Sequence, residues 1–381
     1  MSEVVLNDIC ELIVDCPHST AYDEGTGYPL VRTPNIGRGR IIYSGMHRVC
    51  EEVYNKRNAR AIPQTNDLIF AREATAGNVA LIQEGEKVCL GQRTVLIRPN
   101  ANLVNPAFLT YHLLAPEQQY KLLSTANGAT VAHVNMPTIR NLKLSLPPLA
   151  TQHRIATILS RYDSLIENYQ KQIKLLEEAA QRLYKEWFID LHFPEHENTN
   201  IIDGVPEGWE KKKVGEVIAK VPRSKQIPTK DYQNEGAIPI IDQSRDYIAG
   251  YTDDIESRVE SNEPYIVFGD HTRILKYVPF PFAKGADGTQ LIMSNNLDLM
   301  PQCLLFTSLV SVDLSNYSYA RHFKYLKEEE ILVPTASIAN AFSKHVAKWY
   351  AKIQLNREQI RLLTEARDRL LPKLMSGEIT V

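Results

Sequence analysis

Two long stretches of this 381-residue chain carry apolar side chains at alternating steps of three and four positions. That spacing keeps one stripe of an α-helix apolar over many turns and is typical of coiled-coil helices. Pro147-Pro148 precede the first stretch and Pro334 precedes the second, and because proline does not fit a helix interior, they mark where the helices begin. The predicted seam consists of Ile155, Ile158, Tyr162, Leu165, Tyr169, Ile173, Leu176 and Leu183 in the first helix and of Ile338, Phe342, Val346, Trp349, Ile353, Ile360, Leu363 and Leu370 in the second.

The two predicted helices are copies of one another. A shift of 187 residues places residues 172–183 on residues 359–370 with eight of twelve positions identical, and it also places Pro147 on Pro334. A repeat of this length is far too long for a solenoid and indicates a duplicated module, each copy being a globular domain followed by a long helix. Asn356 and Arg367 occupy polar seam positions, which we expect to fix the register of pairing.

The repeat predicts five segments along the chain. We expect a globular domain at 1–146, a spacer helix at 147–188, a linker at 189–208, a second globular domain at 209–333 and a second spacer helix with a tail at 334–381. The linker contains five acidic and no basic residues, and we expect it to be irregular. Two equal helices can pair in parallel or antiparallel. A linker that only turns the chain into the second domain favours the antiparallel, pseudo-two-fold arrangement.

Short β-rich runs occur at matching places in the two globular segments. Residues 28–33 and 238–243 form one pair of predicted strands, and residues 67–72 and 265–270 form another. Glycine-containing loops follow these runs, and this pattern predicts mixed α/β domains with polar loops along one rim. The loop side chains differ widely between the two copies. Such variation is expected if each domain recognises a different ligand.

The charge and the cysteines narrow the class of protein. The net charge of −2 lacks the basic excess expected of a protein that binds DNA alone by neutralising phosphates. No apolar run of about 18 residues and no secretory signal is found, so we expect a cytoplasmic protein that does not enter a membrane. Cys10, Cys16, Cys50, Cys89 and Cys303 form no CxxC pair, which predicts reduced thiols and no metal site.

Two short motifs raise the alternative of an enzyme. Asn105-Pro106-Ala107-Phe108 is similar to the Asn-Pro-Pro-Phe corner of adenine methyltransferases, but an asparagine N-cap followed by a proline in the first turn explains the same residues. Glu210-Lys211-Lys212 has the form of half a nuclease motif, without a convincing aspartate before it. No glycine-rich methyl-donor loop and no phosphate-binding GxxxxGK[ST] sequence is present, so no cofactor is expected.

Several motifs together resemble the specificity subunits of type I restriction-modification enzymes along essentially the whole chain. They are Leu146-Pro147-Pro148, the run Leu149 to Ala156, the run Gly204 to Trp209 and the ending Leu371 to Ile379. The resemblance implies two target recognition domains, which bind double-stranded DNA, and two spacer helices, which bind two modification (methyltransferase) subunits. It further implies that restriction subunits join this core and that adenine methylation in a split target is carried out by the partner, so that this chain is not an enzyme.

The resemblance carries over no base-contacting residues, so candidates rest on chemistry and loop position. Arginine can pair with guanine, asparagine and glutamine with adenine, and threonine can contact the thymine methyl group. The candidates in the first domain are Arg32, Thr33, Asn35, Arg72, Thr75, Asn78, Arg93, Thr130 and His133. Those in the second are Gln243, Ser244, Arg245, His271, Thr272, Arg273, Lys276, Tyr319, Arg321, His322 and Lys324.

Three other functions stay open at this point. A repressor-like protein that binds DNA alone is disfavoured by the nearly neutral charge. A pure coiled-coil scaffold has no need of polar loops on its globular domains. A fused methyltransferase requires a methyl-donor site, which no motif in the sequence provides.

Overall fold

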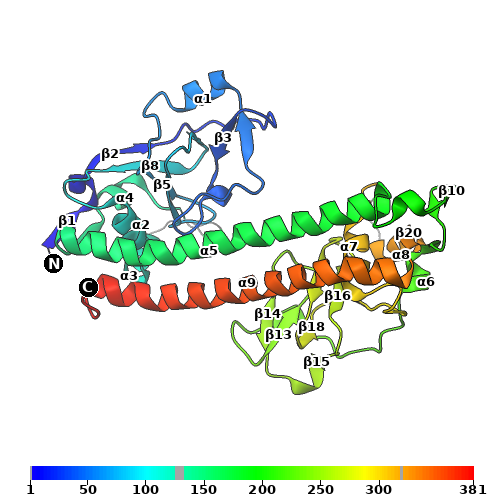
Figure 1. The fold of residues 1–381 in the computed structure, drawn as a ribbon. Helices are drawn as coiled ribbons and strands as arrows, with labels where there is room; N and C mark the ends of the chain where they lie inside the picture. Colours follow the sequence, from blue (N-terminus) through cyan, green and yellow to red (C-terminus); the bar gives the residue numbers. More distant parts are fainter. Residues whose placement is uncertain (1, 125–132, 318–320) are drawn as a thin grey trace. The chain divides into compact units, whose positions relative to one another are not determined.

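The structure of the chain is a computed structural model that describes residues 2–124, 133–317 and 321–381. The chain divides into two compact units, Met1–Glu167 with Arg361–Val381 as unit 1 and Asn168–Ile360 as unit 2. Two long helices, α5 (Leu149–Tyr184) and α9 (Ala336–Ser376), each contribute to both units (Figure 1). The predicted mixed α/β fold with two long helices is therefore confirmed.

Unit 1 contains a two-stranded, a four-stranded and a three-stranded sheet. β1 (Ser2–Val5) pairs with β9 (Lys143–Leu146). The four-stranded sheet has the order β2 (Cys10–Asp15), β8 (Thr94–Pro99), β5 (Leu68–Ala71) and β6 (Val79–Leu81). The three-stranded sheet has the order β4 (His47–Val49), β3 (Tyr28–Val31) and β7 (Cys89–Leu90). The helices are α1 (Glu51–Arg57), α2 (Pro106–Leu114), α3 (Pro116–Ser124) and α4 (Met136–Arg140).

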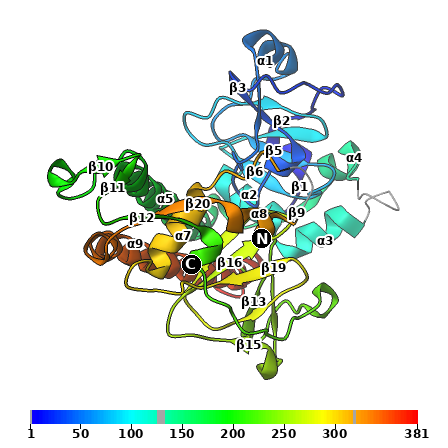
Figure 2. The ribbon, with the colours of Figure 1, turned by 90° about the vertical axis from the view of Figure 1, so that its right-hand side faces the viewer.

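Unit 2 repeats this plan. β12 (Glu210–Lys213) pairs with β20 (Glu330–Val333). One sheet has the order β14 (Gly250–Thr252), β13 (Ile238–Ile241), β18 (Phe282–Lys284) and β15 (Arg258–Val259). The other has the order β17 (Leu275–Val278), β16 (Tyr265–Gly269) and β19 (Thr289–Ile292), and β16 and β19 run side by side in Figure 2. The helices are α6 (Val214–Val217), α7 (Gln302–Ser311) and α8 (His322–Glu328).

The two units share most of their strand pairing, and this supports the duplication inferred from the helices. They differ in β2, which extends one sheet of unit 1, and in β15, which extends the other sheet of unit 2. The strands β3 and β7 pair in parallel in unit 1, as β13 and β18 do in unit 2. The strand β5 lies antiparallel between β6 and β8, as β16 lies between β17 and β19. The strands predicted at 28–33, 67–72, 238–243 and 265–270 are confirmed as β3, β5, β13 and β16.

Within each unit, the segments of α5 and α9 run antiparallel, as predicted. In unit 1 Arg367 pairs with Asp163 at 2.7 Å, and the earlier residue Ile155 shares its core cluster with the later residue Leu374. In unit 2 the amide of Asn356 donates to Gln172 at 3.2 Å, whereas the later residue Tyr184 contacts the earlier residue Phe342. Residue numbers thus rise along one helix as they fall along the other. The helix segments also pack on the globular domain of their own unit.

This double packing shifts the buried stripe away from the predicted seam. Leu165 is 45% exposed and does not lie in the seam, which is a correction to the sequence prediction. The buried positions nearby are Leu159, Asp163 and Ile166. A helix that contacts both a partner helix and a domain buries a wider face than a two-helix seam does, so the buried positions move by one residue. The other predicted seam side chains are buried or half-buried.

The segment between α5 and β12 is more ordered than expected for an irregular linker. It contains a π-helical turn (Lys185–Ile189) and a two-residue hairpin of β10 (Ile201–Ile202) and β11 (Val205–Pro206). Its aromatic side chains pack together in unit 2: Trp209 lies 4.7 Å from Phe193 and 5.3 Å from Phe188, measured between ring centroids. Burial of these rings fixes the path of the chain into the second domain.

Candidate nucleic-acid interface

In unit 1 several polar loops meet at one edge of the four-stranded sheet. β2 and β5 end at this edge and β8 begins there, because β8 pairs antiparallel with both of them. The loops at these strand ends contain the predicted residues Arg72, Thr75, Asn78 and Arg93. Hydrogen bonds from Thr75 to Thr33 and from Asn78 to Ile36 join them to the loop after β3, which holds three more predicted residues. We call residues 32–35, 72–78, 91–93 and 133 the unit 1 rim.

A chain of charged groups runs along the unit 1 rim. Arg72 is buried, and its guanidinium lies 2.8 Å from an oxygen of Asp15 and 2.8 Å from Nε2 of His133. The other ring nitrogen of His133 lies 2.7 Å from Glu73, whose second carboxylate oxygen lies 2.6 Å from Arg93. The Arg93 side chain is 61% exposed. The buried Arg72 and its half-buried partners thus orient one exposed guanidinium.

The corresponding loops of unit 2 form a second rim, residues 242–246, 270–274, 285–288 and 321–324. Gln243 lies at its centre: its amide nitrogen donates to the carbonyl of Asp287 at 2.9 Å, and its amide oxygen accepts from the backbone of His271 at 3.1 Å. The backbone carbonyl of Gln243 accepts from the hydroxyl of Thr272 at 2.7 Å. Three loops are therefore tied together through one side chain.

The same hydrogen bonds hold both rims, although the side chains that the rims present differ. In each rim, a threonine hydroxyl donates to the carbonyl of the second residue after β3 or β13, and a glycine N–H donates to the last carbonyl of that strand. A backbone N–H at or just before the start of α4 or α8 donates to the residue after β5 or β16. The pairs are Thr75 to Thr33, Gly91 to Val31 and Val134 to Arg72 in unit 1, and Thr272 to Gln243, Gly285 to Ile241 and His322 to Asp270 in unit 2. Two domains that share this backbone arrangement but expose different side chains are suited to bind different ligands.

The structure separates the predicted DNA-contacting residues into four groups. Exposed residues are Thr75, Arg93, Arg245, His271, Thr272, Arg273, Arg321 and Lys324. Half-buried residues are Arg32, Asn78, His133, Gln243 and Ser244. Buried residues are Thr33, Asn35, Arg72, Lys276 and His322. Thr130 and Tyr319 lie outside the described residues.

The buried group is not presented to a ligand, which corrects the sequence prediction for these five side chains. Asn35 donates to the carbonyl of Ile42 at 3.0 Å and accepts from the backbone of Arg32 at 3.3 Å. His322 is held by the carbonyls of Asp270 and Tyr317 at 2.9 and 3.2 Å. Buried polar groups need such partners, so these residues shape the loops. Residue type alone could not distinguish them from exposed neighbours.

Lys276 is a buried cation beneath the unit 2 rim. It lies within β17, its ammonium donates to the carbonyl of Asp246, and it is 3.8 Å from the carboxylate of Asp242. Burial lowers the pKa of Lys276 to about 8, since a charged ammonium is less well solvated inside the protein. Its contacts hold the 242–246 loop against the sheet.

Sequence reasoning missed the acids and aromatic residues that orient the rims. Asp15 and Glu73 were not selected, because the candidates were limited to donors and small polar groups that commonly meet bases. Tyr247 was missed too, although its ring lies 3.9 Å from the guanidinium of Arg357 on α9. One available signal was the position of Glu73 directly after Arg72 in the sequence.

The structure also settles the motif at residues 105–108. The side chain of Asn105 accepts from the backbone N–H of Phe108 at 2.9 Å, and Pro106 is the first residue of α2. These are the features of a helix N-cap, and this interpretation is confirmed. Glu210, Lys211 and Lys212 lie in β12, where Lys211 and Lys212 pair with Glu330 and Glu210.

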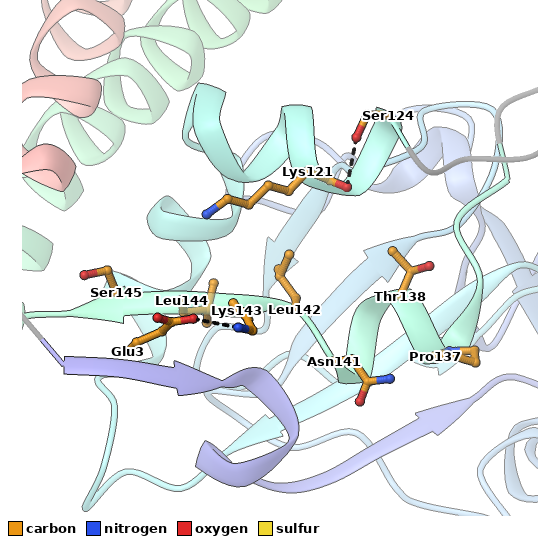
Figure 3. Close-up of a pocket in the computed structure, with 10 residues that line it drawn as sticks. All are labelled: Glu3, Lys121, Ser124, Pro137, Thr138, Asn141, Leu142, Lys143, Leu144 and Ser145. Atoms are coloured by element: carbon orange, nitrogen blue, oxygen red, sulfur yellow. Dashed lines mark hydrogen bonds and ion pairs between the residues drawn. The ribbon is translucent and has the colours of Figure 1, made fainter.

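A separate groove of unit 1 lies between α3, α4 and β9 (Figure 3). Its volume is about 780 Å³, and Glu3 and Lys143 form an exposed ion pair of 3.1 Å on its wall. The lining residues include neither histidine nor cysteine.

The described residues contain neither a metal-ligating cluster nor a disulfide. No cluster of three or more histidine, cysteine or acidic side chains that could hold a metal ion is found in residues 2–124, 133–317 and 321–381. All five cysteines are free thiols. Across the same residues, no helix has the length and apolar character needed to cross a bilayer.

Comparison with known proteins shows which sequences the chain is similar to. Residues 1–178 match the family described as "Type I restriction modification DNA specificity domain". The chain is 27% identical to the type I restriction enzyme MjaIX specificity subunit of Methanocaldococcus jannaschii, over 99% of this chain and 93% of the relative. It is 23% identical to the HindI specificity subunit of Haemophilus influenzae, over 75% of this chain and 80% of the relative.

A solved structure has the same fold. The S subunit of a type I restriction-modification system from M. genitalium superposes with a TM-score of 0.59 at 15% identity, covering 98% of this chain and 95% of that one. The full-length matches agree with the duplicated topology and the two paired helices described above. Over its length the chain is thus similar to type I restriction enzyme specificity subunits, and its residues 1–178 match the DNA specificity domain of that family.

Proposed function

We propose that each globular domain reads one half of a split double-stranded DNA target through its rim. The observation that carries the proposal is the pair of rims, which share their backbone hydrogen bonds and differ in the side chains they expose. Exposed arginine, threonine and histidine side chains suit the donor and acceptor pattern of base edges. Two copies of one scaffold with different surfaces would recognise two different half-sites.

We assign DNA contact to the exposed and half-buried members of both rims. They are Arg32, Thr75, Asn78, Arg93 and His133 in unit 1 and Gln243, Ser244, Arg245, His271, Thr272, Arg273, Arg321 and Lys324 in unit 2. Some of the basic side chains in this set would contact phosphates and fix the orientation of each domain on the DNA. The side chains on the loop tips would contact bases.

The helices α5 and α9 would serve as the spacer between the two half-sites. The 36 residues of α5 correspond to a length of about 54 Å at 1.5 Å per residue. In each unit the helix segments are fixed to the globular domain through buried side chains. The length of the helices would therefore set the separation of the two domains. The unread gap in the DNA target would then depend on helix length.

Two modification subunits and the restriction subunits are the proposed protein partners. Leu175 of α5 and Leu362 of α9 occupy equivalent positions, 187 residues apart, and are 63% and 44% exposed. Because this leucine recurs at the same place on both helices, two copies of one partner would each contact it in the same way. The net charge of −2 also favours a complex in which the partners supply part of the phosphate attraction. Adenine methylation would be carried out by the modification subunit.

Genome-wide mapping of methylated adenine tests the proposal. We expect cells that hold the modification subunit to methylate a split sequence only when this chain is also present. Deletion of the chain should remove that methylation completely. A methylation pattern that is unchanged without the chain would overturn the proposal. Tight sequence-specific binding by the isolated chain at physiological salt would instead favour a repressor-like protein.

A further inference from the structure

Each domain carries one exposed arginine on a left-handed backbone position of its rim. Arg93 has a φ of 63° and lies directly before β8, whereas Arg273 has a φ of 61° and lies two residues before β17. Residues with a side chain seldom adopt positive φ, because Cβ then crowds the backbone. A bulky residue at such a place indicates that its side chain is retained for a purpose.

The two arginines occupy different positions of the shared scaffold. The carbonyl of Arg93 accepts from the backbone of Arg72, and the same bond joins Gly288 to Asp270 in unit 2. Gly288 is therefore the counterpart of Arg93, and it also has a positive φ, of 84°.

At the second left-handed position, the arginine lies in unit 2 and the glycine in unit 1. The N–H of Arg273 bonds to the carbonyl of the last residue of β16, and in unit 1 the N–H of Gly77 bonds in the same way to the last residue of β5. Gly77 has a φ of 89°. At these two shared left-handed positions each rim carries one glycine and one arginine, and the two rims make opposite choices. The unit 1 rim has a third left-handed residue, Ala74, with a φ of 60°.

The glycine turns are covered by neighbouring side chains. A Cβ at Gly77 would lie 2.5 Å from the side chain of Gln119, and a Cβ at Gly288 would lie 2.8 Å from those of Gln243 and His271. The arginine turns are open, with Arg93 and Arg273 exposed. In each rim, only the turn without a covering side chain carries the arginine.

Each guanidinium is held by one of its terminal nitrogens. Nη1 of Arg93 lies 2.6 Å from Glu73, and Nη1 of Arg273 donates to the carbonyl of Leu314 at 2.9 Å. A guanidinium has five N–H donors in a planar fork, so it can keep this bond and still make a bidentate contact. The bond fixes the direction of the side chain before any ligand arrives, which lowers the entropy lost on binding.

We propose that Arg93 and Arg273 are specificity-determining residues that each read one guanine through the bidentate contact with O6 and N7. The inference rests on the proposed function, since it assumes that the rims meet base edges in the major groove. The different positions of the two arginines within the rims would place the guanine differently within each half-site.

Arginine-to-glycine substitution tests the inference without risk to the fold. Arg93→Gly and Arg273→Gly each install the residue that the other domain already has at that position, so the melting temperature should stay the same or rise. With the modification subunit present, Arg93→Gly should relax one guanine position of one half-site, and Arg273→Gly one guanine position of the other. The preference for guanine at that position should fall about 5- to 150-fold.

Asn66→Gly is the matched control, since Asn66 has a φ of 72° and lies at the opposite end of β5 from the rim. It should leave every position of the target unchanged. The inference is overturned if the glycine variants direct methylation with unchanged sequence preference, or if both relax the same half-site. It is also overturned if the variants unfold, because the arginines would then be needed for the structure of the rims. A wild-type chain that directs no methylation of a split sequence would contradict the proposed function itself.

Discussion

Arg367 and Asp163 form an ion pair that joins the last part of α9 to the first part of α5 within unit 1. Their side chains are 16% and 5% exposed, and Nη1 lies 2.7 Å from Oδ1. The hydroxyl of Tyr111 on α2 donates to the other oxygen of Asp163 at 2.5 Å. One carboxylate thus holds two helices and the globular domain together.

Unit 2 solves the same packing problem without charge. The residue 187 positions after Asp163 is Tyr350, and Arg367 is the counterpart of Ala180. Tyr350 shares a hydrogen bond of 3.0 Å with Thr307 of α7, and all of these side chains are buried. Because Tyr350 replaces Asp163 at the equivalent position, only unit 1 offers Arg367 this buried carboxylate. The ion pair therefore favours the register in which these parts of α5 and α9 lie together in unit 1, as polar seam residues fix register in other coiled coils.

Removal of one partner of this ion pair should destabilise unit 1 strongly. We expect Arg367→Ala to lower the free energy of unfolding by about 3–5 kcal/mol, because it leaves the buried Asp163 carboxylate without its cation. The apolar double variant Asp163→Leu with Arg367→Met should recover most of that loss. Urea unfolding measures both effects, and Arg161→Ala, at an exposed position of α5, serves as the control. A double variant as unstable as Arg367→Ala would contradict the explanation.

His112 should make unit 1 less stable in mild acid. It is buried in α2, its Nδ1 lies 3.4 Å from the sulfur of Met375, and burial lowers its pKa to about 4. The unfolded chain, with a histidine pKa of about 6.5, binds the proton first as the pH falls. Stability should therefore decrease as the pH falls from about 7 to 5, by on the order of 2 kcal/mol.

The variant His112→Leu should flatten this pH dependence, while His345→Leu, at an exposed position of α9, should leave it intact. Thermal unfolding at pH 7 and pH 5 gives the comparison. An unchanged pH dependence in His112→Leu would show that another group causes it.

How much the sequence could predict differs between the helices and the rims. The repeat and its proline boundaries predicted α5 and α9, because periodic burial leaves a periodic pattern. The antiparallel pairing was predicted from the linker between them. Leu165 was misplaced, since the pattern does not reveal that α5 packs on a domain as well as on α9. For the same reason, the buried Asp163 was invisible. The rim loops were found from glycine and polar runs, but their side-chain directions depend on tertiary contacts such as that of Arg72 with Asp15.

The stacked pair of Arg357 and Tyr247 should set the order of the unit 2 rim. Arg357 on α9 lies over the Tyr247 ring and also pairs with Glu177 at 3.1 Å, while the Tyr247 hydroxyl donates to the carbonyl of Tyr277 at 2.5 Å. Loss of the guanidinium removes the contact that holds the end of the 242–246 loop. We expect Arg357→Ala to increase hydrogen exchange in this loop and to weaken recognition of one half-site only.

Arg357→Lys keeps the charge but loses the planar stacking surface, so it should fall between the wild type and Arg357→Ala. The unit 1 rim provides the internal control, since its exchange rates should not change. Equal weakening of both half-sites would mean that Arg357 acts through the helices as a whole.

Helix length should determine the unread gap of the target. Duplication of residues 169–172 in α5 together with residues 356–359 in α9 keeps the pairing of Gln172 with Asn356 and adds about 6 Å to each helix. That length corresponds to about two base pairs at roughly 3.4 Å per pair. The extra four residues also rotate the helix in the same right-handed sense as the DNA. We therefore expect the mapped target to keep both half-site sequences and to gain about two unread base pairs. Four residues inserted after Asn198, outside the helices, should leave the gap unchanged. Altered half-site sequences, or an unchanged gap in the double duplication, would rule out the helices as the spacer.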